Sequence, residues 1–98
     1  MTRDEALRRL RAREADLRAM GIAHLSLFGS VARDEAGVTS DVDLAVTFAD
    51  PAHTGLFHYA VVSDRLQQAL GGPIDLVCEP AAKPRVQAGI DRDRVDVF

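Results

Sequence analysis

Apolar residues in the first twenty positions recur with the spacing of a helix. The residues that form this stripe are Leu7, Leu10, Leu17 and Met20. Thr2, followed three positions later by Glu5, has the form of a capping box and favours a helix start there. Gly21 readily adopts the left-handed conformation that ends many helices. The pattern therefore predicts one helix between Thr2 and Gly21.

Shorter apolar stretches with β-branched residues predict strands over 23–28, 41–48 and 74–78, and a short last strand over 95–98. The predicted helices between them run from Gly29 to about Glu35 with Gly37 as the break, from 56 to 70 before Gly71-Gly72-Pro73, and from Pro84 onward. A chain of 98 residues has room for one domain. We therefore expect a single α/β (α+β) domain over 1–98, with a small mixed β-sheet flanked by helices.

Composition restricts where such a domain acts. The chain has no apolar run long enough to span a bilayer, and its charged N-terminus does not resemble a signal peptide. A single cysteine, Cys78, cannot form an internal disulfide, so nothing in the sequence requires an oxidising compartment. Because Cys78 lies at the end of a predicted strand, we expect it to be a small buried hydrophobe. These features predict a cytoplasmic protein without a membrane partner.

The net charge of −3 argues against direct binding of nucleic acid. Six arginines fall within the first 18 residues, but acidic residues are interleaved with them. Three pairs have the favourable i,i+4 order, namely Asp4–Arg8, Glu5–Arg9 and Glu14–Arg18. We interpret this stretch as a salt-bridged helix face in solvent, in preference to a basic binding patch.

Three acidic residues stand in stretches that are otherwise apolar. Asp41 and Asp43 are two apart on one predicted strand, so both carboxylates project from the same side, with their backbones roughly 6.6 Å apart. Asp75 lies in a further apolar strand that can pair beside the first. At about 5 Å and an effective dielectric near 20, each pair of like charges costs on the order of 3 kcal/mol. A divalent cation removes that cost, and ligands that are all oxygen favour Mg²⁺ or Mn²⁺ over zinc.

Gly29-Ser30 lies where a predicted strand turns into a helix. Glycine lets the backbone approach a ligand closely, and the N–H groups at a helix start attract an anion. A phosphate chain at this turn would meet metal ions held by Asp41 and Asp43. The assembly suits nucleotidyl transfer, in which metals neutralise the triphosphate and stabilise the attacking and leaving oxygens.

Two nearby polar residues each have two possible roles. Arg33 either reaches the phosphates or forms a salt bridge with Asp34, Glu35 or an acid at a strand end. Ser40 either caps the turn before the strand, which is favoured, or contacts the phosphates.

These motifs resemble those of the minimal nucleotidyltransferase (MNT) family of the DNA polymerase β-like superfamily. The matching segments are Leu27-Phe28-Gly29-Ser30-Val31-Ala32-Arg33, then Ser40-Asp41-Val42-Asp43-Leu44 with ten residues between Gly-Ser and Asp-x-Asp, then Asp75-Leu76-Val77 and Lys83-Pro84-Arg85. The resemblance covers nearly the whole chain and implies a polymerase β-like nucleotidyltransferase fold. It implies that Gly29 and Ser30 bind the triphosphate, with Arg33 as a further candidate. It also implies that Asp41 and Asp43 hold two Mg²⁺ (or Mn²⁺) ions, and that Asp75 binds the catalytic ion and helps to deprotonate the acceptor.

The resemblance also implies a biological role. Members of the family serve as antitoxins that transfer AMP from ATP to a tyrosine of a HEPN-domain ribonuclease toxin, with which this chain would form a hetero-oligomer. The alternative is a non-catalytic antitoxin that neutralises the toxin by binding. The intact Asp41, Asp43 and Asp75 favour the enzyme, because a pure binder would be free to lose them. A third possibility is a small-molecule nucleotidyltransferase of the aminoglycoside type, but the sequence shows no second domain to hold such an acceptor.

The predicted helix over 56–70 is more apolar than an exposed helix needs to be. Its apolar residues include Phe57, Tyr59, Val61 and Val62. Core packing explains part of this composition, and a partner interface is the second interpretation.

Overall fold

Four strands form one mixed sheet in the computed structural model, which describes residues 1–35 and 41–98. In chain order the elements are α1 (Arg3–Arg11), α2 (Glu14–Ala19), β1 (Ile22–Phe28), α3 (Gly29–Ala32), β2 (Val42–Phe48), the 3₁₀ turn η1 (Pro51–His53), α4 (Leu56–Leu70), β3 (Ile74–Cys78), α5 (Pro84–Asp93) and β4 (Val95–Asp96). The predictions for Gly37 and Ser40 lie outside the described residues. The expected class, a small mixed sheet flanked by helices, is confirmed.

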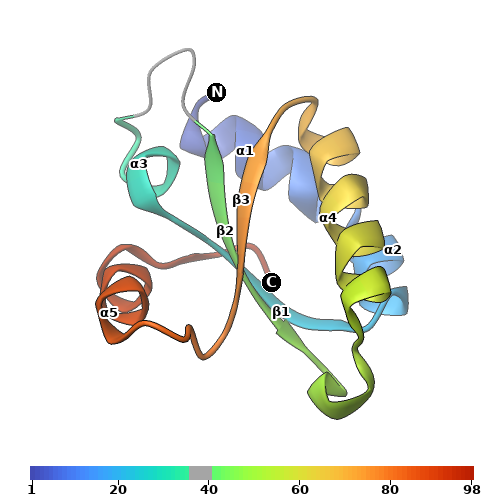
Figure 1. The fold of residues 1–98 in the computed structure, drawn as a ribbon. Coiled ribbons are helices and arrows are strands. Elements are labelled where there is room, and N and C mark those ends of the chain that lie inside the picture. Colours follow the sequence, from blue (N-terminus) through green and yellow to red (C-terminus); the bar gives the residue numbers. More distant parts are fainter. Residues whose placement is uncertain (36–40) are drawn as a thin grey trace.

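The strands lie side by side in the order β3-β2-β1-β4 (Figure 1). β1 runs antiparallel to β2 and β4, whereas β3 runs parallel to β2. A parallel pair needs a crossover connection, and α4 supplies it between β2 and β3. The register pairs Phe28 with Asp43, and Asp43 with Asp75. The end of β1 and the beginnings of β2 and β3 therefore meet at one end of the sheet.

The main core lies between the sheet and helices α1, α2 and α4, which stand on one side of it in Figure 1. Its fully buried leucines include Leu10, Leu17, Leu25, Leu27, Leu44 and Leu66. Strand residues alternate between the two faces, so Ser26 faces away from this core and donates a hydrogen bond to Asp96 of β4 (3.1 Å). On that second face, Ile90 of α5 is fully buried outside the main core cluster. Helix α5 thus covers the face on which Asp43 also lies.

Long-range polar contacts fasten the end of α5 to the sheet. Arg94, which follows the helix, donates to Glu79 Oε1 (2.8 Å) and to Ser26 Oγ (3.1 Å). The Arg94 guanidinium holds the pKa of Glu79 below its usual value, against the opposing effect of burial. Pro84 occupies the first turn of α5, as the sequence predicts. The Arg94–Glu79 ion pair therefore fixes the C-terminal end of α5, and no local sequence pattern predicts it.

The single N-terminal helix predicted between Thr2 and Gly21 is wrong, because the chain forms two helices there. The helical path breaks at Arg13 (φ −108°, ψ 11°). The break lets α1 pack against α4 while α2 packs against β1. The predicted ends are confirmed: Thr2 Oγ1 accepts a hydrogen bond from the Glu5 N–H (3.1 Å), and Gly21 follows α2 with φ +92°.

The salt-bridged face of α1 and α2 is mostly as predicted. The ion pairs present are Glu5–Arg9 (2.5 Å) and Glu14–Arg18 (2.8 Å). Asp4 instead faces Arg3, at 3.8 Å, in place of the predicted Arg8. Over the described ranges, no helix has the length and apolar character needed to cross a bilayer.

The remaining elements differ from the predictions mainly at their ends. Helix α4 and strand β3 occupy their predicted ranges, and Gly71 ends α4 in the left-handed conformation (φ +76°). Helix α3 ends at Ala32 and not near Glu35. Strand β2 begins at Val42, so Asp41 precedes the strand on which it was expected to lie.

Candidate active site

The turn from β1 into α3 brings the two predicted motifs into contact. Gly29 has φ +69°, a conformation that side chains other than glycine disfavour. A Cβ atom added at Gly29 would collide with the carboxylate of Asp43. Glycine is therefore required on two independent grounds. The Gly-Ser turn and the Asp-x-Asp strand, separated by ten residues of chain, form one site.

The three predicted carboxylates gather at this end of the sheet. Asp43 and Asp75 are register partners on the parallel strands β2 and β3, and Asp41 lies just before β2. Asp43 is half-buried, whereas Asp41 and Asp75 are exposed. Burial raises the pKa of Asp43, and the charges of Asp75 and then Asp41 raise it further, while Arg33 lowers it. The repulsion predicted from the sequence therefore acts on Asp43.

These carboxylates fit a divalent metal ion by their chemistry. They are all-oxygen donors at the same end of the sheet, and a hard cation would relieve the unfavourable charge on Asp43. Within 1–35 and 41–98, however, no group of three or more His, Cys, Asp or Glu side chains is arranged to hold a metal ion. Asp41, Asp43 and Asp75 are thus neighbours and do not form a closed set of ligands. Their assignment as metal ligands stays a prediction.

Arg33 shows the salt bridge that was one of its two predicted roles. Its guanidinium donates to Glu35 (3.1 Å), which the sequence suggested, and to Asp93 at the end of α5 (2.6 Å). The second partner was not predicted, because Asp93 is sixty positions away and carries no local signal. Phosphate binding by Arg33 stays a prediction, and its influence on Asp43 places it within electrostatic reach of the site.

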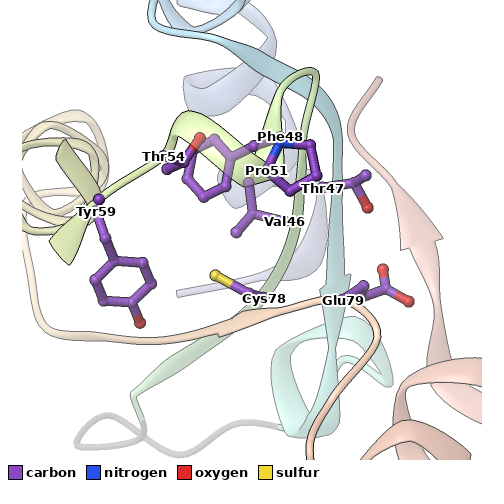
Figure 2. Close-up of a pocket in the computed structure, with 9 residues that line it drawn as sticks. Val46, Thr47, Phe48, Pro51, Thr54, Tyr59, Cys78 and Glu79 are labelled. Carbon is purple, nitrogen blue, oxygen red and sulfur yellow. The ribbon is translucent and has the colours of Figure 1, made fainter.

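A cavity of about 210 Å³ lies at the other end of the same strands (Figure 2). Its lining includes Val46 and Phe48 of β2, Cys78 of β3, and Tyr59 of α4. The prediction that Cys78 is buried is wrong: the residue is exposed, because the final position of β3 opens onto this cavity. Partial desolvation raises the pKa of its thiol. The cavity is separate from the acidic residues, which lie at the opposite ends of β2 and β3.

Core packing explains only some of the apolar residues of α4. Val62 is fully buried, and the Tyr59 hydroxyl donates to the Leu76 carbonyl (2.5 Å), so core packing accounts for both. Leu56 and Phe57 are 83% and 85% exposed, and Val61 is also exposed. Core packing does not account for these three, which we name the α4 patch. Contact of a partner with the α4 patch therefore stays a prediction.

Comparison with known families gives a match to the family described as "Nucleotidyltransferase domain", over residues 5–97. A protein of Methanocaldococcus jannaschii, provisionally named a protein adenylyltransferase, is 31% identical over 78 residues, or 80% of this chain and 82% of the relative. Another protein of that organism with the same provisional name is 33% identical over 78 residues, or 78% of this chain and 76% of the relative. The family match, over residues 5–97, includes Gly29, Asp43 and Asp75.

Solved structures give the same picture. One provisionally described as a minimal nucleotidyltransferase has a TM-score of 0.72 at 32% identity, covering 97% of this chain and 95% of that one. A toxin–antitoxin structure with AMP-PNP has a TM-score of 0.72 at 22% identity, covering 90% of this chain and 72% of that one. The structure of a tri-AMPylated Shewanella oneidensis HEPN toxin in complex with MNT antitoxin has a TM-score of 0.64 at 21% identity. The match covers 90% of this chain and 68% of that one. The last two likenesses concern the fold alone.

Proposed function

The chain belongs to the nucleotidyltransferase domain family, and from that premise we propose that it transfers AMP from ATP to a hydroxyl of a partner protein. The observation that carries the proposal is the contact between Gly29 and the Asp43 carboxylate. It joins the turn that suits a phosphate chain to the carboxylates that suit the ions accompanying that chain. The names of the M. jannaschii relatives support protein as the acceptor.

ATP is the proposed donor. The triphosphate lies against the Gly29-Ser30 turn, whose backbone the Asp43 carboxylate approaches closely because Gly29 has no side chain. Arg33 is a further candidate for phosphate contact, because its charge already lowers the pKa of Asp43. The toxin–antitoxin neighbour solved with AMP-PNP supports an adenine nucleotide.

Asp41, Asp43 and Asp75 would hold the metal, for which we propose two Mg²⁺ ions with Mn²⁺ as a substitute. When bound, such ions neutralise the triphosphate and stabilise the charge that develops during transfer. Asp43 and Asp75 also have separate positions relative to the substrates. Asp43 sits beneath the turn and orients toward it, while Asp75 is exposed on the neighbouring strand, accessible to an incoming acceptor.

The transfer exchanges one bond at phosphorus and moves one proton. The acceptor oxygen attacks the α-phosphorus of ATP, and the bond from that phosphorus to the bridging oxygen of pyrophosphate breaks. Pyrophosphate leaves with the bond's electron pair, and AMP stays on the acceptor as a phosphodiester. Asp75 receives the hydroxyl proton. We propose tyrosine as the acceptor; its ordinary pKa of about 10 means that it needs this help at neutral pH.

The proposed partner is a HEPN-domain ribonuclease toxin, which this chain would neutralise as an antitoxin in the cytoplasm. The support comes from the solved HEPN toxin in complex with MNT antitoxin, whose fold this chain shares. Each AMP adds a phosphodiester charge to the toxin, which would repel the backbone of an RNA substrate. One transfer can therefore silence the ribonuclease without formation of a lasting complex.

The second candidate function is neutralisation by binding alone. The α4 patch favours it, because exposed residues such as Phe57 suit a lasting complex. Both functions need a contact surface, so the patch does not exclude the enzyme. The two differ in whether Asp41 and Asp43 are needed.

The nucleotide site can be tested by thermal unfolding with Mg²⁺ and ATP. A ligand that binds the native state at 100 times its Kd adds about 2.7 kcal/mol, so Tm should rise. Asp41→Asn should abolish the rise and leave the ligand-free protein as stable as the wild type or more so, because repulsion on Asp43 is relieved. A ligand-free Asp41→Asn protein that is markedly destabilised would instead assign Asp41 a structural hydrogen bond.

A further inference from the structure

Helix α3 is too short to hold its own position. It has four residues, and the backbone hydrogen bonds at its end run from the Arg33 N–H to the Gly29 carbonyl (3.1 Å), from the Asp34 N–H to the Val31 carbonyl (3.0 Å) and from the Glu35 N–H to the Ser30 carbonyl (2.8 Å). Isolated helices far longer than this are marginal in water. The placement of the Gly29-Ser30 turn at its start therefore depends on contacts that other elements make with α3.

Three such contacts reach the end of α3, two from the start of α1 and one from the end of α5. At the start of α1, the Arg3 N–H donates to the Asp34 carboxylate (3.1 Å), and the Arg3 guanidinium donates to the Ala32 carbonyl (3.5 Å). At the end of α5, Asp93 accepts from the Arg33 guanidinium (2.6 Å). Figure 1 shows α3 and α5 on the same side of the sheet.

Of the two carboxylates that contact Arg33, Asp93 is the better enclosed. The Asp93 side chain is 7% exposed, whereas Glu35, the other partner of Arg33, is 66% exposed. Asp93 also accepts two hydrogen bonds from Arg92 (3.1 and 3.2 Å), so one carboxylate lies between two guanidinium groups. Without it, Arg33 and Arg92 would face each other as like charges. Arg33 would then lose its tie to α5 and be pushed outward.

We propose that Asp93 is a positioning residue for nucleotide binding, which holds α3 and its Gly29-Ser30 turn in place through Arg33. This inference rests on the proposed function, in which that turn receives the triphosphate. Asp93 does not contact the nucleotide. Its effect passes through the ion pair with Arg33 and the backbone bond from Arg33 to Gly29.

The test measures the Kd of AMP-PNP with Mg²⁺ by calorimetry, at a temperature where each variant is folded by circular dichroism. Asp93→Ala should raise Kd about threefold or more, within the range that a single, partly exposed ion pair can supply. Asp91→Ala is the matched control. Asp91 lies on the same helix and contacts Gln87 (3.0 Å) and Arg94 (3.4 Å), so its loss should leave Kd unchanged.

A double-mutant cycle separates positioning from general stabilisation. Asp93→Ala should have no further effect on Kd when Arg33→Ala is already present. A residue that only stabilises the fold would lower Tm and leave the Kd of the folded protein unchanged. If Asp93→Ala does not fold, Asp93→Asn removes the charge at nearly constant size and should weaken binding in the same direction.

Three results would overturn the inference: an unchanged Kd in both Asp93 variants, effects of Asp93→Ala and Arg33→Ala that simply add, or tighter binding. Tighter binding would mean that Asp93 withholds Arg33 from the phosphates. A wild type that binds no AMP-PNP would instead contradict the proposed function itself, so the two failures are distinguishable.

Discussion

Asp43 combines the features that define the site at the scale of a single residue. It is a half-buried carboxylate on a strand whose neighbours Val42 and Leu44 are buried and apolar. Its carboxylate occupies the space that a side chain at position 29 would need. Burial and two like charges raise its pKa, so its ionised form is unfavourable in the folded chain. A residue kept under these conditions serves a purpose other than packing.

The raised pKa of Asp43 predicts how stability depends on pH. Between the ordinary carboxyl pKa of about 4 and the higher folded value, the folded state binds more protons than the unfolded chain. The free energy of unfolding therefore falls as pH rises through this window, and the full penalty remains above it. Asp43→Asn removes the penalty and should be more stable than the wild type at pH 7, with the difference vanishing below about pH 4.

Urea unfolding at several pH values checks this prediction. Asp64→Asn is the control, because Asp64 is exposed on α4 and contacts Gln68, far from the acidic residues. A wild type more stable than Asp43→Asn at pH 7 would show that the ionised carboxylate makes a net favourable contact.

At the scale of elements, the sequence predicts the boundaries of helices and strands best where glycine or proline marks them. Helix α4 and strand β3 have their predicted ranges, because Gly71-Gly72-Pro73 separates them and leaves little choice of boundary. The break at Arg13 was missed because no glycine or proline marks it; it follows from how α1 and α2 pack. The apolar spacing on either side of Arg13 therefore suggested one helix.

In the candidate site, too, some features could be predicted from the sequence and others could not. Its motif residues could be predicted, since Gly29, Asp43 and Asp75 each break a local pattern of apolar or helical residues. The ion pair between Arg33 and Asp93 could not be, because it depends on where α5 docks against α3. The metal ligation stays a prediction, and Ser40 lies outside the residues that the structure describes.

The α4 patch predicts the effect of a charge at its centre. Phe57→Asp should weaken the complex with the partner toxin by about 2 kcal/mol, or about thirtyfold in Kd, as loss of a central aromatic anchor does. Nucleotide binding should not change, because α4 begins beyond the end of β2 that is opposite Asp43. Calorimetry with toxin and with AMP-PNP measures the two effects separately.

Gln67→Asp provides the matched control on the same helix. Gln67 is exposed on the C-terminal half of α4, away from the patch, so an added charge there should leave toxin binding unchanged. Equal weakening by both variants would indicate a general effect of charge. Unchanged binding by Phe57→Asp would place the partner on another surface.

At the scale of the whole molecule, the candidate active site and the α4 patch lie at opposite ends of the sheet. Asp43 and Phe48 mark the two ends of β2, roughly 17 Å apart along the strand. The acidic residues and the Gly29 turn gather at one end, and the cavity with the start of α4 lies at the other. A partner can therefore be held at one end while a flexible acceptor segment reaches the other. We therefore expect substitutions at one end to affect catalysis and substitutions at the other end to affect partner binding.

The central claim is that the chain modifies its partner, and mass spectrometry of the toxin after incubation with ATP and Mg²⁺ tests it most directly. With the wild type, the toxin should become heavier by one or more adenylyl units, on a tyrosine. Asp41→Ala combined with Asp43→Ala should prevent the change, because those carboxylates are needed for transfer and not for docking. A toxin of unchanged mass with either protein, and neutralised equally by both, would contradict the account and leave binding alone as the function.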